Sequence, residues 1–441
     1  MLSTMLHSLT WFLGAFGATL ATLALLRYRL SHYEKHIDLK NTLQEISQEV
    51  ALGYFQHCYN KLCELSGQEP YKSQIEVLKA QCLQGLGRKE ELLEFLLRTL
   101  EHHPKNHTAR RMLSRQLVEV ADYPRALEQF EILGANIQEE DLFAYASALY
   151  QTGRFSQCQQ MIEQNCRQPN GQILGLLGDS LFEQQEWGLA LDYYQKAENL
   201  GWRPLGQISH KAISSLKLSR YQEAEILFRE WLRASPSDLE SVTGLACCLE
   251  RQNKVEEACK LLDQYEEDLS EDPLAQATLG RCHFRRKQYA RSTHHLLNAY
   301  ELGHTDPSTL ALAAISLEKQ TRWSHAEKLY ETLVKEFPED ISGYAGLSYL
   351  FAIGQVREVG PQRGLDLALK TVELQPCMAS WEILSASYAR CGMFEKAHQI
   401  QENLMRYAKE ESALSRRQDS MRKLRQHKPL GSQLVLRMEV A

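Results

Sequence analysis

Adjacent histidines are the residues of this sequence whose type first suggests chemistry, because imidazole can bind zinc or transfer protons. They occur as His102–His103 and His294–His295. Neighbouring residues on a helix point about 100° apart, so one metal ion cannot easily take both side chains of a pair. We therefore expect these histidines to be packed or solvated and not to bind a metal.

The 11 cysteines predict neither a disulfide scaffold nor a zinc site. Most of them fall inside helical patterns beside Ala and Leu, without the regular spacing of a secreted disulfide framework. A zinc ribbon needs paired C-x-x-C motifs, and the nearest approach to one is the adjacent pair Cys247 and Cys248. The pattern indicates buried thiols in a reducing compartment.

Catalytic motifs are missing from the sequence. It contains no Gly-rich phosphate loop, no H-E-x-x-H zinc motif and no G-x-S-x-G nucleophile motif. Charge is nearly balanced, with 50 Lys and Arg against 56 Asp and Glu, so no global field attracts nucleic acid. We therefore expect neither an enzyme nor a cofactor-dependent or nucleic-acid-binding protein.

The N-terminal segment has the composition of a membrane anchor. No Asp, Glu, Lys or Arg occurs before Arg27, and the run 10–26 is apolar or small throughout. About twenty such residues cross a bilayer as a helix. Arg27, Arg29 and Lys35 follow it, which by the positive-inside rule keeps the C-terminal side cytoplasmic. This pattern predicts a single-pass anchor at 1–30, with 5–26 in the membrane.

Two alternatives to the anchor remain open. One is a cleaved leader that ends near Ala21, because small residues are frequent in this segment. The other is a buried N-terminal helix. A leader normally carries its positive charge before the apolar run, whereas here the charge follows it, and this order favours the uncleaved anchor.

The rest of the chain is an internal repeat, whose period is marked by a small residue that recurs at steps of 32 to 37, most of them 34. These residues are Ala80, Ser114, Ala146, Gly178, Ala212, Ala246, Gly280, Ala314, Ser348 and Ser385. A second small residue follows in most units, at Ala126, Cys158, Ala190, Ala224, Ala258, Ser292, Ala326 and Ala397. Two antiparallel helices approach closely only where both present small residues, so the pattern predicts ten helical pairs.

One unit shows the repeat signature most completely. It contains Trp381-x2-Leu384-Ser385-x2-Tyr388, followed by Phe394, Ala397 and Leu404. The chain resembles the tetratricopeptide repeat (TPR) family, whose mark is W-x2-L-G-x2-Y, A-x3-F and then Pro. The resemblance covers roughly residues 70–410 and implies an all-α superhelix, here with an N-terminal transmembrane helix.

The units are flanked and interrupted by other segments. We expect a helical cap or linker at 31–69, the array of about ten units at 70–410, and a basic C-terminal helix and tail at 411–441. The basic stretch 416–428 fits a solvated helix better than a contact with acidic lipid or RNA. An insertion at 355–363 precedes Gly364, which takes the place of the usual Ala. Because loops tolerate added length at little cost, we favour an insertion without a binding role over one that contacts a partner.

The resemblance also implies where partners bind. TPR arrays hold extended peptides or partner helices on the concave surface formed by the first helix of each unit. The side chains expected there are those after each small residue and one turn away, and aromatic and Arg residues among them dominate binding energy. They are Arg111, Arg115, Phe143, Tyr150, Asp179, Phe182, Arg281, Phe284, Arg285 and Lys319.

One TPR subtype is disfavoured. Arrays that grip the C-terminal carboxylate of chaperones use Lys and Asn in consecutive units. The corresponding residues in this chain are Gln81, Arg115, Ser147 and Asp179, with no Asn among them.

These features predict a membrane-anchored scaffold or adaptor that binds a protein or peptide partner, with a cytoplasmic repeat domain at a bacterial inner membrane. Its organisation is similar to that of inner-membrane TPR proteins that regulate envelope lipid synthesis, but their C-terminal zinc ribbon is missing here. A preprotein or translocation receptor is the alternative from a different class. A periplasmic or secreted assembly factor with a cleaved leader is the third, and the oligomeric state is open.

Overall fold

The computed structural model of the chain describes residues 27, 29, 33, 37–65, 71–355, 360–406 and 411–430. Those residues form helices and no strand, which confirms the all-α prediction. The predicted membrane segment 5–26 lies outside them. None of the helices within the described ranges combines the length and the apolar character needed to cross a bilayer.

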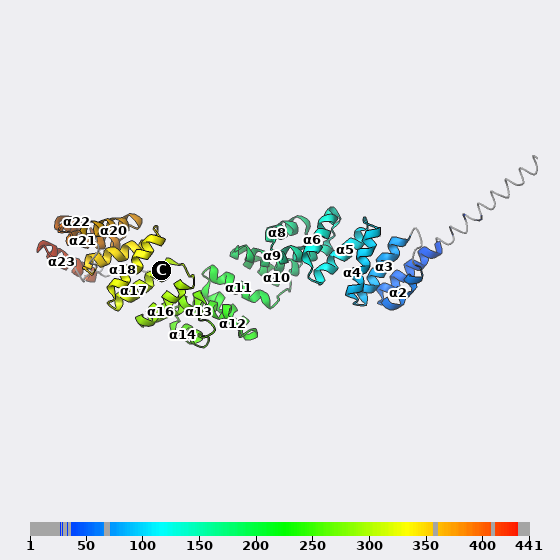
Figure 1. The fold of residues 1–441 in the computed structure, drawn as a ribbon, viewed down its shortest axis with the longest axis horizontal. Helices are drawn as coiled ribbons and strands as arrows, with labels where there is room; N and C mark the ends of the chain where they lie inside the picture. Colours follow the sequence, from blue (N-terminus) through cyan, green and yellow to red (C-terminus); the bar gives the residue numbers. More distant parts are fainter. Residues whose placement is uncertain are drawn as a thin grey trace, which may run out of the picture. The chain divides into compact units, whose positions relative to one another are not determined.

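The chain divides into two compact units, residues 1–203 and 204–441, which are described separately. In the first unit the described helices follow one another as antiparallel neighbours in chain order (Figure 1). They are α2 (Phe55–Glu64), α3 (Lys72–Gly85), α4 (Lys89–His102), α5 (His107–Glu119), α6 (Tyr123–Leu133), α7 (Leu142–Gln151), α8 (Phe155–Asn165), α9 (Gly171–Glu183) and α10 (Trp187–Asn199). Two short 3-10 turns, η1 (Gly134–Asn136) and η2 (Glu139–Asp141), separate α6 from α7.

The second unit continues the same alternation of first and second helices. Its helices are α11 (Gly206–Lys217), α12 (Tyr221–Ala234), α13 (Leu239–Arg251), α14 (Val255–Asp263), α15 (Pro273–Arg285), α16 (Tyr289–Glu301), α17 (Pro307–Lys319), α18 (Trp323–Glu336), α19 (Ile341–Ile353), α20 (Pro361–Leu374), α21 (Met378–Arg390), α22 (Phe394–Met405) and α23 (Glu411–Arg425). The pairs from α3–α4 to α21–α22 correspond to the ten predicted repeats.

The predicted small residues lie where the two helices of a pair meet, and all ten first-helix positions are buried. A Cβ on Gly178 would come within 2.6 Å of the Tyr194 ring. The Ser292 hydroxyl donates to the Gly280 carbonyl at 2.9 Å, across the same kind of contact. Close approach at these positions confirms the reasoning that identified the repeat.

Each turn within a pair contains a residue with positive φ, at a position seven residues after the small residue in nearly every unit. Gly87 shows the geometry: Arg88 N donates to the Leu83 carbonyl at 3.1 Å, the bond that closes a Schellman motif. Residues other than Gly occupy this left-handed position in six turns: Ala121, Gln185, Ser219, Asn253, Lys287 and Thr321.

The predicted cap at 31–69 has the geometry of a further repeat. Residues 37–51 form a helix, and α2 follows it after Gly53, whose φ is +90°. The Cys58 thiol lies 3.9 Å from the Ile46 carbonyl, and these residues are 34 positions before Leu92 and Ala80. The sequence pattern missed this pair because Ile46 is large where the other units have a small residue.

The predicted insertion is shorter than expected at its C-terminal end. Helix α20 begins at Pro361, so Pro361 to Arg363 form its first turn, and residues 356–359 lie outside the description. Proline is favoured at the first position of a helix because its missing N–H would have no partner there. Gly364 packs as predicted, since a Cβ on it would meet the Phe351 ring at 2.3 Å.

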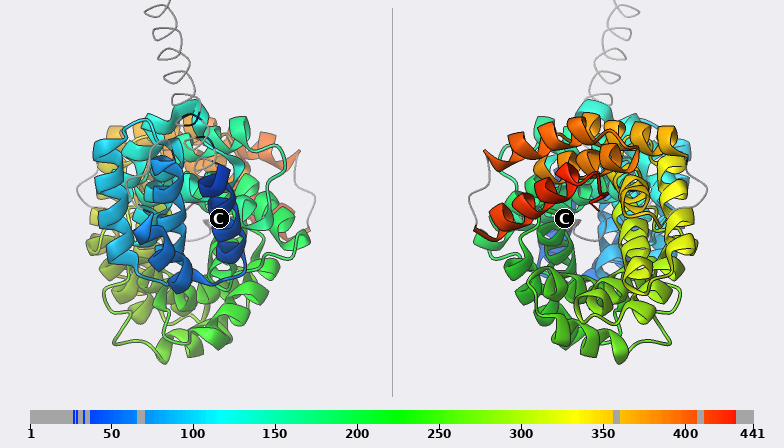
Figure 2. Two further views of the ribbon diagram at one scale, coloured as in Figure 1. Left: turned by 90° about the vertical axis from the view of Figure 1, so that its right-hand side faces the viewer. Right: turned by 90° about the vertical axis from the view of Figure 1, so that its left-hand side faces the viewer.

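The basic C-terminal helix α23 lies against α22, and Figure 2 shows it as the red helix of the right-hand view. Its Arg417 is buried, donates to the Leu404 carbonyl at 2.7 Å and pairs with Glu382 at 3.1 Å. Leu424 packs into a cluster with Ala386. One face of α23 therefore covers the end of the last repeat, whereas its Arg416, Arg422 and Arg425 side chains are exposed.

Candidate functional site

A cavity of about 470 Å³ opens in the second unit on the first helices α13, α15 and α17. Arg281, Phe284 and Arg285 line it, and all three are among the side chains predicted to bind partners. They share one face of α15 because residues three and four positions apart on a helix are neighbours.

Glu250 of α13 organises the charge of this cavity. Its side chain is 1% exposed, and Arg285 approaches its carboxylate at 2.9 Å and Arg281 at 3.3 Å. Arg285 also donates to the Glu250 carbonyl at 2.8 Å, and Arg251 lies 3.7 Å from the carboxylate. A buried carboxylate needs such partners, so Glu250 fixes where the guanidinium groups stand.

The start of α17 contributes the polar residues Ser308 and Thr309 to the lining. Thr309 is 2% exposed, and its hydroxyl has no hydrogen-bond partner among the described residues. Ser308, which also lines the cavity, donates to Asp306, the residue that caps α17. The N-terminus of a 13-residue helix carries partial positive charge, which adds to that of the arginines.

Apolar side chains complete the lining. Phe284 meets Tyr289 edge to face, with ring centroids 5.7 Å apart, and Leu312 of α17 and Tyr221 of α12 also line the cavity. The cavity therefore combines cationic donors, a hydroxyl and apolar surface, a set that suits a peptide better than a metal or a catalytic intermediate.

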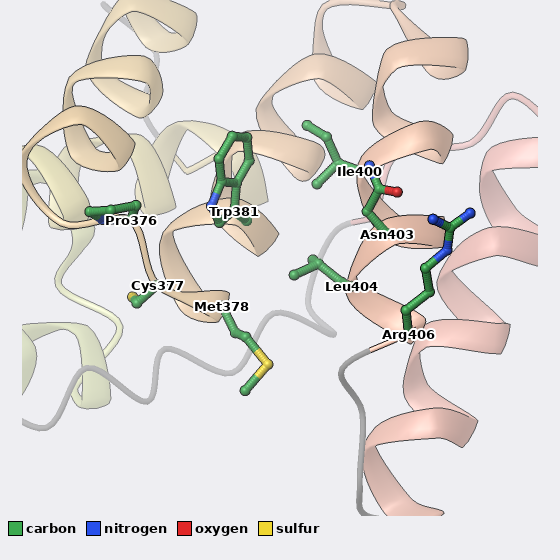
Figure 3. Close-up of a pocket in the computed structure, with 8 residues that line it drawn as sticks. All are labelled: Pro376, Cys377, Met378, Trp381, Ile400, Asn403, Leu404 and Arg406. Carbon is green, nitrogen blue, oxygen red and sulfur yellow. The ribbon is translucent and has the colours of Figure 1, made fainter.

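A second cavity, of about 500 Å³, lies in the last repeat between the start of α21 and the end of α22 (Figure 3). Met378 and Trp381 are 52% and 38% exposed, and Ile400 and Leu404 face them across the gap. Arg406 stands at its edge. This lining mixes apolar side chains with the polar Asn403 and Arg406, and none of the predicted partner-binding residues lies in it.

In the first unit, several predicted residues already have partners within the chain. The Arg115 side chain bonds Asp141, with Nε 2.6 Å from the carboxylate, and it also pairs with Glu140 at 3.3 Å. Asp141 is fully buried. Asp179 accepts from the Tyr194 hydroxyl at 2.9 Å. These side chains therefore join neighbouring helices.

The aromatic predictions of the first unit are only partly exposed. Phe182 meets Trp187 with centroids 5.3 Å apart, and Tyr150 meets Phe155 at 5.5 Å. Burial raises the pKa of Tyr150 to about 12. Phe143 is the most open of this set, at 40% exposed.

The two remaining predicted residues lie outside the cavity. Arg111 of α5 is half-buried, with a buried Nε that has no partner among the described residues, and Lys319 is exposed on α17. The structure thus brings together Arg281, Phe284 and Arg285, and it places no other predicted residue with them.

The sequence pattern missed six of the lining residues: Tyr221, Glu250, Arg251, Ser308, Thr309 and Leu312. Glu250 stands four residues after the small residue Ala246, where other units have Tyr150, Phe182 or Phe284. A carboxylate at this position, which occurs in one other unit as Glu318, was the available signal. Thr309 carries no such signal in the sequence, because its place in the lining depends on how α17 packs beside α13 and α15.

No known family profile and no curated protein match the sequence. Solved structures of TPR proteins are similar to the chain at TM-scores below 0.5. YrrB, a TPR protein with an unusual peptide-binding site, is 15% identical over 44% of this chain and 97% of its own, with a TM-score of 0.38. The P58(IPK) TPR domain is 14% identical over 88% of this chain and 98% of its own, with a TM-score of 0.35. A TPR protein from Parabacteroides merdae is 14% identical over 56% of this chain and 98% of its own, with a TM-score of 0.40.

Proposed function

We propose that this chain is a helical-repeat scaffold that binds partner proteins or peptides through the first helices of its repeats. One observation carries the proposal: Arg281, Phe284 and Arg285, predicted from the repeat register, line one open cavity on α15. Arginine and aromatic side chains are enriched among residues that dominate binding energy, and a partly enclosed setting strengthens their contacts.

The proposed scaffold is tethered to a membrane. Its support is the apolar sequence 5–26 followed by Arg27 and Arg29, which predicts a single-pass anchor with a cytoplasmic repeat domain, at a bacterial inner membrane. A chain that lacks residues 1–26 should move from the membrane to the soluble fraction on cell fractionation. Membrane recovery equal to that of the full chain would refute the tether.

The charge of the cavity bears on the preprotein-receptor alternative. Transit peptides are rich in Arg and poor in acidic residues. Arg251, Arg281 and Arg285 outnumber the single carboxylate of Glu250 in the lining, so such a peptide would meet charge of its own sign. This observation favours the scaffold or adaptor over the receptor.

The test is proximity labelling followed by affinity capture, with wild type compared with Phe284→Ala. Loss of a ring at the centre of a contact should reduce recovery of the bound partner several-fold. Arg322→Ala is the matched control, because this exposed side chain lies outside the cavity lining. Equal recovery of every partner by Phe284→Ala and Arg322→Ala would contradict the proposal.

A further inference from the structure

We infer that the cavity on α13, α15 and α17 binds an acidic segment of a partner protein, in which a side-chain carboxylate is received by the arginines beside an apolar neighbour. This inference rests on the proposed function and names the chemistry of its partner.

The first support is the charge around the cavity. Arg251, Arg281 and Arg285 carry three positive charges, against one negative charge on Glu250, so the lining has an excess of two. Glu250 is buried beneath the arginines at 1% exposure, with Oε1 2.9 Å from Arg285 and Oε2 3.3 Å from Arg281. Its role is to hold the guanidinium groups in place, and an incoming anion meets their outer faces.

The arginines retain donors for a ligand. Arg251 and Arg285 are each 40% exposed, whereas Arg281 is 16% exposed and also donates to the Thr278 hydroxyl at 2.9 Å. A guanidinium group has five N–H donors, more than the bonds of Arg281 and Arg285 to Glu250, Thr278 and Asn253 consume. The planar fork suits the two oxygens of a carboxylate.

The second support is independent of charge. Thr309 lines the cavity, and its buried hydroxyl has no hydrogen-bond partner among the described residues. Buried hydroxyls in folded proteins are nearly always hydrogen-bonded, so an unpartnered one in a residue of the cavity lining is a donor available to a ligand. Its position in the first turn of α17 also favours an anion, since the helix N-terminus is positive.

The apolar lining separates a peptide from other anions. Phe284 and Leu312 offer surface to an aliphatic or aromatic side chain beside the carboxylate, which a free phosphate does not have. Nucleic acid would require a basic stripe with open aromatic faces for base stacking. Here Phe284 is engaged by Tyr289, which leaves Tyr221 as the other aromatic ring of the lining, and the whole chain carries a net charge of −6.

The experiment measures fluorescence anisotropy of labelled peptides with the full chain. One peptide alternates Glu with Leu, a second replaces each Glu by Gln, and a third replaces each Glu by Lys; all have amidated C-termini, so only side-chain carboxylates differ. The Glu peptide should bind at least about tenfold more tightly than the Gln peptide, its affinity should fall with added salt, and the Lys peptide should not bind.

Three variants locate the contact. Arg251→Gln and Thr309→Val should each weaken binding of the Glu peptide several-fold, because the first removes a charge and the second a hydroxyl at nearly constant shape. Arg322→Gln, outside the cavity, should leave it unchanged. Far-ultraviolet circular dichroism verifies that each variant is folded, and Thr309→Val serves where Arg251→Gln fails to fold.

The outcomes distinguish this inference from the proposed function. If Glu and Gln peptides bind equally and Phe284→Ala weakens both, the cavity binds peptides but the acidic preference is wrong. If single-stranded RNA or inorganic phosphate binds with the same variant sensitivity and the Glu peptide does not, the inference is overturned. If no peptide binds and partner capture is also independent of Phe284, both proposals fall.

Discussion

Thr321 illustrates strain held at a single residue. It sits at the left-handed position of the turn between α17 and α18, with φ of 60°. A β-branched residue is a rare occupant of that region, which costs an L-residue roughly 1–2 kcal/mol relative to Gly. Thr321→Gly should therefore raise the free energy of unfolding by about 1 kcal/mol, after the entropy of Gly is subtracted. Chemical denaturation followed by circular dichroism measures it.

The matched comparison is Asn253→Gly at the equivalent turn, where φ is 65°. Asn tolerates the left-handed region better than Thr, so its replacement should gain less. An equal gain at both positions, or a loss at Thr321, would contradict strain as the cause. Both substitutions lie in turns, and Asn253→Gly also removes the 3.4 Å bond that the Asn253 amide oxygen accepts from Arg285, which further reduces the gain expected there.

His295 connects residue chemistry with pH. Its ring stacks on that of His283, with centroids 5.2 Å apart, and Nδ1 lies 2.9 Å from the Gln276 amide oxygen. Burial, followed by the charges of His283, His294 and Arg291, lowers its pKa from 6.5 to about 4. In the unfolded chain His295 is protonated below about pH 6.5, whereas in the folded chain it stays neutral down to about pH 4. The free energy of unfolding therefore falls as the pH drops from about 6.5 to about 4.

His295→Gln should reduce that loss. We expect the urea midpoint of the wild type to fall between pH 7 and pH 5, and to fall less in the variant, with the remainder due in part to His283, whose pKa is also lowered by burial. His102→Gln, at an exposed position, is the control. Identical pH profiles for wild type and His295→Gln would reject the explanation.

At single positions, the sequence predicted which side chains share a helix face better than it predicted the residues that they contact. The register placed Arg281, Phe284 and Arg285 on one helix face, and helical spacing is enough for that. The same register also predicted that Arg115 binds a partner, but in the structure Arg115 bonds the buried Asp141 of the next repeat. Such a bond depends on the stacking of two units and on a short 3-10 turn, neither of which a 34-residue period specifies.

Gly364 tests packing at the scale of a helical pair. A Cβ at this position of α20 would stand 2.3 Å from the Phe351 ring of α19. Gly364→Ala should therefore lower the free energy of unfolding by about 1–3 kcal/mol, the usual cost of overpacking. Gly188→Ala is the matched control, because nothing lies within 4 Å of a Cβ there. If Gly364→Ala were as stable as Gly188→Ala, the close contact between α19 and α20 would be wrong.

The sequence predicted the helical pairs better than it predicted single contacts or the division of the chain into units. Small residues are needed wherever two helices approach closely, so their period located ten pairs. The eleventh pair, 37–51 with α2, was missed because Ile46 occupies the small position. The start of α20 was placed too late, since Pro361 favours a loop and a helix start equally and only the structure distinguishes them.

For the whole molecule, the repeat period predicted a solenoid but not its division into 1–203 and 204–441. The steps from Gly178 to Ala212 and onward remain 34, so the period continues across the boundary. Where one core ends and another begins depends on side-chain packing that a periodic pattern does not record.

This division makes a prediction about the location of binding. Every buried apolar cluster of the described residues draws its members from one unit alone. The cavity with Glu250, Arg281 and Thr309 belongs entirely to 204–441. That fragment should therefore fold alone, with a helical spectrum and a sigmoidal urea transition, and should bind the Glu peptide within about twofold of the full chain. A folded fragment that binds at least tenfold more weakly would show that residues 1–203 contribute to the site.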